Sequence, residues 1–202
     1  RACRGGYDSN KCSGWQDSVV ITKTPPPTTV SVSLKGNGDV YLSWAKSTWS
    51  TSYQWQKQLN GAAWATAGST SAVAATISAA QSPPGSYKFR VRGCLVSSLF
   101  SHCADWRESA TLTIAKPGSP AKVTASANTA GNVSVAWTAV KAASGYQVEK
   151  KFDGGAWQSQ SNSTSTSLVI LNANAAVGTY QFRVRACRGG YDSNKCSGWQ
   201  DS

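Results

Sequence analysis

The amino-acid sequence predicts an all-β protein built from tandem β-sandwiches. Apolar and polar residues alternate with a period of two in many short segments, which is typical of half-buried strands. Turn-forming groups rich in Gly, Asn and Pro separate these segments at short intervals. Most of the pattern then recurs after 93 residues, so the chain of 202 residues holds more than one copy of the same unit.

Strands are expected in the same order in both copies. In the first copy the alternating segments are Val30–Leu34, Val40–Trp44, Tyr53–Gln56 and Tyr87–Val91. The second copy repeats the pattern at Val133–Trp137, Tyr146–Val148 and Tyr180–Val184. About seven short strands in a module of about 92 residues is typical of a β-sandwich, and no segment favours a helix longer than one turn.

An identical repeat of residues 1–18 at residues 185–202, an offset of 184, indicates a larger unit made of two modules. We expect residues 1–23 to be the end of a preceding module, residues 24–115 the first full module, and residues 116–202 a second module. This second module lacks its last strand, the counterpart of Ser18–Lys23. Because the chain also opens on Arg1 and has no Met, we expect a window from a longer array. An engineered duplication is the alternative.

Composition and short motifs argue against catalysis within these residues. The chain is 40% hydrophobic and 14% charged, enough to bury cores, but it has only one His and nine acidic residues. The acids are scattered over turns, and no nucleophile signature, phosphate loop, dinucleotide fingerprint or calcium loop occurs. We therefore predict no enzyme activity and no cofactor. The longest apolar runs, such as Leu168–Leu171, are far shorter than the roughly 20 residues of a membrane span.

Three features together give the modules a family resemblance. Each copy has a Trp on the second strand, a Tyr on the third, and Gly-x-Tyr-x-Phe-Arg-Val-Arg on the sixth. Followed by Cys, a loop and Cys, they resemble the fibronectin type III modules of secreted bacterial proteins. The resemblance covers the whole chain and implies seven-stranded sandwiches, with Tyr87 and Tyr180 as tyrosine corners. It also implies modules that bind, space and adhere without catalysis.

The six cysteines fall into three pairs, each nine residues apart: Cys3 with Cys12, Cys94 with Cys103, and Cys187 with Cys196. If each pair flanks the loop between the sixth and seventh strands, a local disulfide closes that loop. Such disulfides favour an oxidising, extracellular compartment. A zinc site needs four ligands, whereas each module offers two Cys, and only His102 is near one pair. No metal site is therefore predicted.

Alternation along the sixth strand places a row of cations on its outer face. We expect a Trp that follows the second Cys of each module to stack between two guanidinium planes. The members of this cation-π ladder are Arg90, Arg92 and Trp106 in the first module, and Arg183, Arg185 and Trp199 in the second. The repeated spacing favours a structural role. A site for anions or nucleic acid, with aromatic residues between the cations, is the alternative.

The two modules differ most in the loops at one end, the end that faces the preceding module in a type III topology. The disulfide loop of the second module, residues 188–195, is polar, whereas the first module carries large apolar residues there, where solvent is expected. We expect an interface that docks on a neighbouring module or chain, formed by Trp49, Leu95, Val96, Leu99 and Phe100. The alternative is that the loop folds back over its own sandwich.

The favoured function is the structural repeat unit of an extracellular fibre, stalk or adhesin, assembled from neighbouring copies of the chain. A carbohydrate-binding accessory module of a secreted enzyme or toxin is the alternative, with Trp49, Trp64 and Trp157 as stacking platforms. The net charge of +11 becomes +10 when the shared eighteen residues are counted once. This charge favours attraction to acidic polysaccharide, a cell surface or extracellular DNA, but it identifies no specific nucleic-acid ligand.

Overall fold

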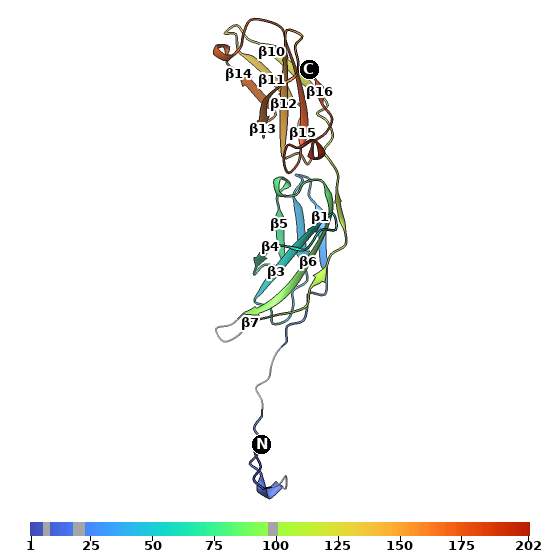
Figure 1. Ribbon diagram of the computed structural model, residues 1–202, viewed down its shortest axis with the longest axis vertical. Coiled ribbons are helices and arrows are strands. Elements are labelled where there is room, and N and C mark those ends of the chain that lie inside the picture. Colours follow the sequence, from blue (N-terminus) through green and yellow to red (C-terminus); the bar gives the residue numbers. More distant parts are fainter. Residues whose placement is uncertain (6–8, 18–22, 97–100) are drawn as a thin grey trace.

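Two β-sandwiches lie end to end, preceded by a short disulfide-closed segment (Figure 1). The structure is a computed structural model that describes residues 1–5, 9–17, 23–96 and 101–202. In these ranges the only helices are 3-10 turns of three residues, at Ser9–Lys11, Ala79–Gln81, Asn172–Asn174 and Ser193–Lys195. The prediction of an all-β protein made of tandem sandwiches is confirmed. No helix within the described ranges is long and apolar enough to cross a membrane.

The first module packs a small antiparallel sheet against a larger one. The small sheet has the order β1–β2–β5, with the bounds Val30–Leu34, Val40–Trp44 and Ala74–Ile77. In the larger sheet, β3 (Ser52–Leu59) lies between β4 (Ala65–Thr70) and β6 (Gly85–Val96). Alternate side chains of both sheets meet in one core that includes Leu42, Tyr53 and Phe89. The period-two pattern of the sequence therefore selects the buried face of each strand.

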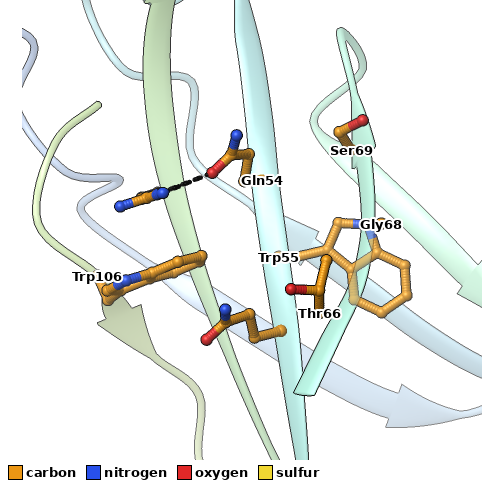
Figure 2. A pocket seen from close by; sticks show the side chains of 8 residues that line it. Gln54, Trp55, Thr66, Gly68, Ser69 and Trp106 are labelled. Atoms are coloured by element: carbon orange, nitrogen blue, oxygen red, sulfur yellow. Dashed lines mark hydrogen bonds between the residues drawn. The ribbon is translucent and has the colours of Figure 1, made fainter. Parts of the chain in front are cut away.

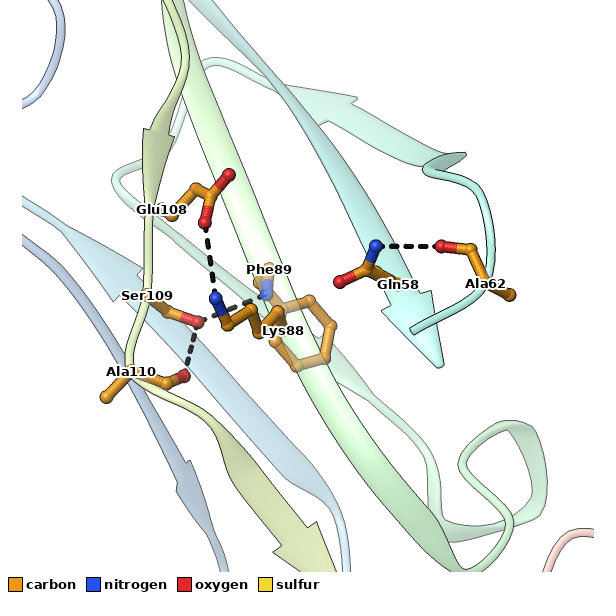
Figure 3. Close-up of polar contacts among 7 residues, drawn as sticks. All are labelled: Gln58, Ala62, Lys88, Phe89, Glu108, Ser109 and Ala110. Carbon is orange, nitrogen blue, oxygen red and sulfur yellow. Dashed lines mark hydrogen bonds and ion pairs between the residues drawn. The ribbon is translucent and has the colours of Figure 1, made fainter. Parts of the chain in front are cut away.

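The last strand position of the first module is divided into three short strands. These are β7 (Ser101–Cys103), β8 (Arg107–Glu108) and β9 (Leu112–Ile114), and all three pair with β6. Figure 3 shows Ser109 between β8 and β9, where its Oγ accepts the Phe89 N–H at 3.1 Å and donates to the Ala110 carbonyl at 2.7 Å. The Ser109 side chain thus takes over a backbone ladder bond at the break.

The second module repeats this arrangement about its own core. Its small sheet has the order β10–β11–β14, with the bounds Val123–Ala127, Val133–Trp137 and Ser167–Ile170. Its larger sheet has the order β13–β12–β15–β16, with the bounds Gln158–Ser163, Gly145–Phe152, Tyr180–Cys187 and Gln200–Asp201. Val135, Val148 and Phe182 are fully buried in the core between these sheets. Each module therefore has a separate hydrophobic core.

A tyrosine fixes the connection between the two sheets in each module. The Tyr87 hydroxyl donates a hydrogen bond to the Pro83 carbonyl at 2.8 Å, and the Tyr180 hydroxyl donates to the Ala176 carbonyl at 2.9 Å. In both cases the acceptor lies four residues upstream. This geometry is that of a tyrosine corner, as the family resemblance implies.

Candidate functional site

A ladder of stacked cations and aromatic rings crosses the outer face of the larger sheet in the first module. The guanidinium carbon of Arg90 lies 4.5 Å from the Trp64 ring centroid and 4.8 Å from that of Trp106. The corresponding carbon of Arg92 lies 4.4 Å from the Trp106 centroid. The indole of Trp106 therefore contacts both arginines of β6, and Trp64 extends the ladder by one further ring.

The same ladder recurs in the second module. Arg183 lies 4.5 Å from the Trp157 ring centroid and 4.6 Å from that of Trp199, and Arg185 lies 4.5 Å from Trp199. The amino-terminal segment contains a third, shorter version, in which the guanidinium of Arg1 lies 4.9 Å from the Trp15 ring. Because residues 1–18 and 185–202 are identical, the Arg–Trp contact recurs with and without a sandwich beneath it.

Polar side chains of the neighbouring strand hold the arginines in place. Arg92 pairs with Gln54 across β6 and β3, and its Nε donates to Gln54 Oε1 at 3.0 Å. In the second module Arg183 pairs with Glu149, and its Nε donates to Glu149 Oε2 at 2.8 Å. Figure 2 shows Gln54 and Trp106 on this face. These bonds explain how several cations can lie along one strand.

An open groove of about 340 Å³ runs beside the first ladder, between Trp55 and Trp106 (Figure 2). Trp55 is only 8% exposed, because its indole packs over Gly68, where an added Cβ would lie 2.8 Å from Nε1. Arg92, which also lines the groove, is already stacked and hydrogen-bonded. This arrangement favours a structural role for the ladder over an anion-binding one.

The three disulfides close short loops that hold the same element in each copy. Cys94–Cys103 joins β6 to β7, Cys187–Cys196 joins the last residue of β15 to the loop that follows it, and Cys3–Cys12 closes the amino-terminal segment. Cys94 and Cys187 are at most 1% exposed. No group of three or more His, Cys, Asp or Glu side chains that could hold a metal ion occurs in the described part of the chain.

The apolar residues at the free end of the first module lie partly within the described structure. Trp49 is 62% exposed and Val96 is 52% exposed, while Leu95 is half-buried. Thr51 holds their two loops together, because its N–H donates to the Cys94 carbonyl at 2.9 Å and its Oγ1 accepts from the Val96 N–H at 3.0 Å. Leu99 and Phe100 lie outside the described residues.

A second surface at a module end was not anticipated from the sequence: the joint between the two sandwiches. Arg188 follows the first Cys of the second module and reaches across to the first module. Its guanidinium donates to the Ser82 carbonyl at 2.8 Å, the Ser82 hydroxyl at 2.8 Å and the Gly38 carbonyl at 2.6 Å. A fourth bond, to the Ala142 carbonyl at 3.0 Å, ties it to its own module. One side chain thus links the two modules by hydrogen bonds.

Two glycines permit the close approach that this joint requires. A Cβ on Gly38 would lie 2.7 Å from the Ala142 Cα, and one on Gly189 would lie 2.7 Å from the Pro83 backbone. Both glycines also have positive φ angles, +89° and +67°, which other residues rarely adopt. The backbones of the two modules therefore meet without intervening side chains.

The electrostatics of the joint are those of a buried cation that donates four hydrogen bonds. Arg188 is 0% exposed, and burial lowers the pKa of its guanidinium, while nearby Tyr87 and Asp39 oppose that shift. Burial also raises the pKa of Tyr87 to about 12, and the charge of Arg188 acts in the opposite direction. Because arginine keeps its proton in proteins, the joint contains a permanent charge that only correctly placed oxygens can stabilise.

The expectation that the polar disulfide loop of the second module faces solvent is wrong at Arg188. The sequence does offer a signal for this contact, but only when the modules are compared position by position. Arg188 occupies the position of Leu95, and its acceptor Ser82 occupies the position of Ala175. When a residue and its cross-module partner both differ between the copies, the difference indicates a contact that is specific to this pair of module ends.

Known proteins resemble this chain in fold. A mutant of the domain FN3tt is 19% identical, over 46% of this chain and 97% of its own, with a TM-score of 0.38. A two-domain fibronectin type III segment of chicken tenascin is 13% identical over 88% of this chain and 97% of its own, also with a TM-score of 0.38. The FN1–FN3 domains of chicken CNTN1 are 17% identical over 89% of this chain, with a TM-score of 0.37.

This chain spans 65% of the length of that CNTN1 fragment. No known family model and no curated protein matches the chain. The sheet order and the two separate cores identify the modules as β-sandwiches.

Proposed function

We propose that the chain is a non-catalytic structural unit of an extracellular fibre, stalk or adhesin, in which sandwiches joined end to end act as rigid spacers. The proposal also includes the division into modules at residues 1–23, 24–115 and 116–202. Partners in this function are neighbouring copies of the same chain.

The observation that carries the proposal is the buried Arg188 between the two modules. Burying a charge is strongly unfavourable unless matched oxygens accept its hydrogen bonds, and Arg188 has four such oxygens. These bonds require the two modules to keep one relative position, which a flexible tether would not need. The joint therefore fixes the angle between neighbouring sandwiches, and a fixed angle repeated along an array gives a regular rod. Disulfide closure of each module supports an extracellular setting.

Carbohydrate binding has less support from the side chains. Trp64 and Trp157, two of the candidate platforms, each lie about 4.5 Å from an arginine guanidinium of the ladder. A sugar ring stacking on the same face would have to displace that cation. Trp49 remains exposed, but it has no counterpart in the second module, where Ala142 occupies its position.

Immunogold electron microscopy of intact source cells tests the proposed function. An antibody raised against this chain is expected to label surface filaments at regular intervals. Label confined to the cell interior, or to isolated globules, would overturn the proposal. Binding of the purified chain to insoluble polysaccharides, lost on Trp49→Ala, would support the accessory-module alternative instead.

A further inference from the structure

The joint inside the chain defines which loops meet when two modules are placed end to end. The second module contributes the loop with Ala142 and the disulfide hairpin with Arg188. The first module contributes the β1–β2 hairpin with Gly38 and the β5–β6 connection with Ser82. We call the end with the loop of Ala142 and the hairpin of Arg188, or their counterparts in the other module, the leading end. We call the end with the hairpin of Gly38 and the connection of Ser82, or their counterparts, the trailing end.

Each module has both ends, so one leading end and one trailing end lie outside the internal joint. The outer leading end belongs to the first module and exposes Trp49 and Val96. Val73 lies there too, because its carbonyl accepts the N–H of Trp44, the residue at which β2 ends, at 3.0 Å, and it is 41% exposed. The outer trailing end belongs to the second module and exposes Leu171 at 57% and Val177 at 102%.

The 93-residue repeat shows that both sides of the joint change together. On the leading side, Ala142, Thr166 and Gly189 of the second module correspond to larger apolar residues of the first module: Trp49, Val73 and Val96. On the trailing side, Ser78, Ser82 and Pro84 in the β5–β6 connection of the first module correspond to Leu171, Ala175 and Val177 in the second. The small and polar pair of surfaces thus has an apolar counterpart, with the replacements on matching loops.

We propose that the outer leading end of one copy docks on the outer trailing end of a second copy, so that a head-to-tail apolar joint links successive chains. This inference rests on the proposed function and names its partner surface. Exposed apolar groups at both ends leave water when the ends meet, and this burial favours association. Such an interface is heterologous, because each copy uses two different surfaces, and an array built from it does not close by itself.

The internal joint also explains why the two kinds of end do not mix. An outer leading end carries Leu95 where the internal joint has Arg188, so it cannot satisfy the Ser82 and Gly38 oxygens. Conversely, an Arg188 guanidinium placed on a trailing end with Ala175 loses the hydroxyl that accepts one of its hydrogen bonds. A buried charge with fewer acceptors and buried oxygens without donors are both unfavourable, so polar ends select polar ends and apolar ends select apolar ends.

Sister-module substitutions test this joint with little risk to the fold. Trp49→Ala introduces the residue that the second module has at the same backbone conformation, since Trp49 and Ala142 have φ angles of +68° and +64°. Leu171→Ser with Val177→Pro introduces the trailing-end residues of the first module. Val169→Ser is the matched control, because Val169 is 54% exposed on β14 but lies on a strand rather than in an end loop.

Sedimentation velocity of the 202-residue chain measures association. The protein concentration is raised to about 1 mM, which is the effective concentration that short linkers impose on tethered modules. We expect the wild type and Val169→Ser to rise above the monomer mass of 21.2 kDa with concentration. Trp49→Ala alone and the Leu171→Ser, Val177→Pro variant alone are each expected to stay monomeric. Circular dichroism melting checks that every variant is folded.

Mixing the two deficient variants gives the decisive result. Trp49→Ala retains an intact trailing end and the other variant an intact leading end, so the mixture is expected to form dimers and no larger species. The proposal is overturned if the wild type stays monomeric. It is also overturned if the trailing-end variant associates as well as the wild type, since the Trp49 surface would then pair with itself. Labelled surface filaments would still support the proposed function in either case.

Discussion

Tyr87 is a buried phenol whose proton is held by a backbone carbonyl of the connection that forms the joint. It is 1% exposed and donates to Pro83, the residue next to Ser82. Burial favours the neutral phenol, which is why its pKa rises to about 12. At the scale of single residues, the tyrosine corner and the Arg188 site are therefore coupled through one short connection.

This pKa predicts a loss of stability in alkali. Because the folded protein favours the neutral phenol, Tyr87 contributes fully to the unfolding free energy below pH 10, its ordinary pKa, and the contribution disappears as the pH rises to about 12. Urea unfolding of the wild type and Tyr87→Phe at several pH values measures it. The wild type should be more stable by about 1 kcal/mol at neutral pH, from one hydrogen bond, and this advantage should vanish by pH 12. A constant difference would contradict the assignment.

The cation-π contacts predict a second effect at the residue scale. Trp106 contacts two guanidinium groups, so Trp106→Ala should lower the unfolding free energy of the first module by at least about 1–2 kcal/mol. Trp15→Ala is the control, because Trp15 is 77% exposed and belongs to neither core. Thermal melting followed by tryptophan fluorescence compares them. Equal effects of the two substitutions would argue against the ladder as a stabilising element.

At the scale of elements, the disulfide hairpins anchor the carboxyl end of the sixth strand position in each module. By the chain-entropy model, a ring of ten residues stabilises the fold by about 2.7 kcal/mol. Replacing Cys94 and Cys103 together by Ala should lower the unfolding free energy of the first module by up to this amount. Guanidinium unfolding of the double variant checks the value. An unchanged midpoint would mean that β6 and β7 are held by their pairing alone.

The strands were predictable because their chemistry is local. Alternation of apolar and polar residues selects the face of a strand, and the repeat shows the same selection twice, so β1, β2, β6 and their counterparts followed from the sequence. The break between β8 and β9 did not, because it depends on the Ser109 side chain bonding to Phe89 on another strand. Trp64 and Trp157 were missed as ladder members for the same reason, since they approach the arginines from a different strand connection.

The Arg188 site could not be found from the sequence of one module alone, for a different reason. Its cross-module acceptors lie 106 and 150 residues away along the chain, at Ser82 and Gly38. Three of its four hydrogen bonds go to main-chain carbonyls, which every residue type provides. A polar loop beginning Arg-Gly-Gly looks solvent-exposed when it is considered within one module. Only the end-to-end placement of two modules turns it into a buried contact.

At the scale of the whole molecule, two kinds of joint alternate along the proposed array. One is polar and tight, with Gly38 and Gly189 allowing the backbones to approach. The other, proposed between copies, is apolar and brings together larger side chains such as Trp49 and Val177. Because each joint selects its own kind of end, the order of modules is set by chemistry as well as by covalent connection.

The rigidity of the internal joint is tested most directly by backbone ¹⁵N relaxation of the whole chain. If Arg188 locks the sandwiches together, amides of both modules should fit one common rotational diffusion tensor in the wild type. In Arg188→Leu, which introduces the residue found at position 95, each module should tumble with its own shorter correlation time. Two independently tumbling modules in the wild type, or an unchanged common tensor in Arg188→Leu, would contradict the locked joint.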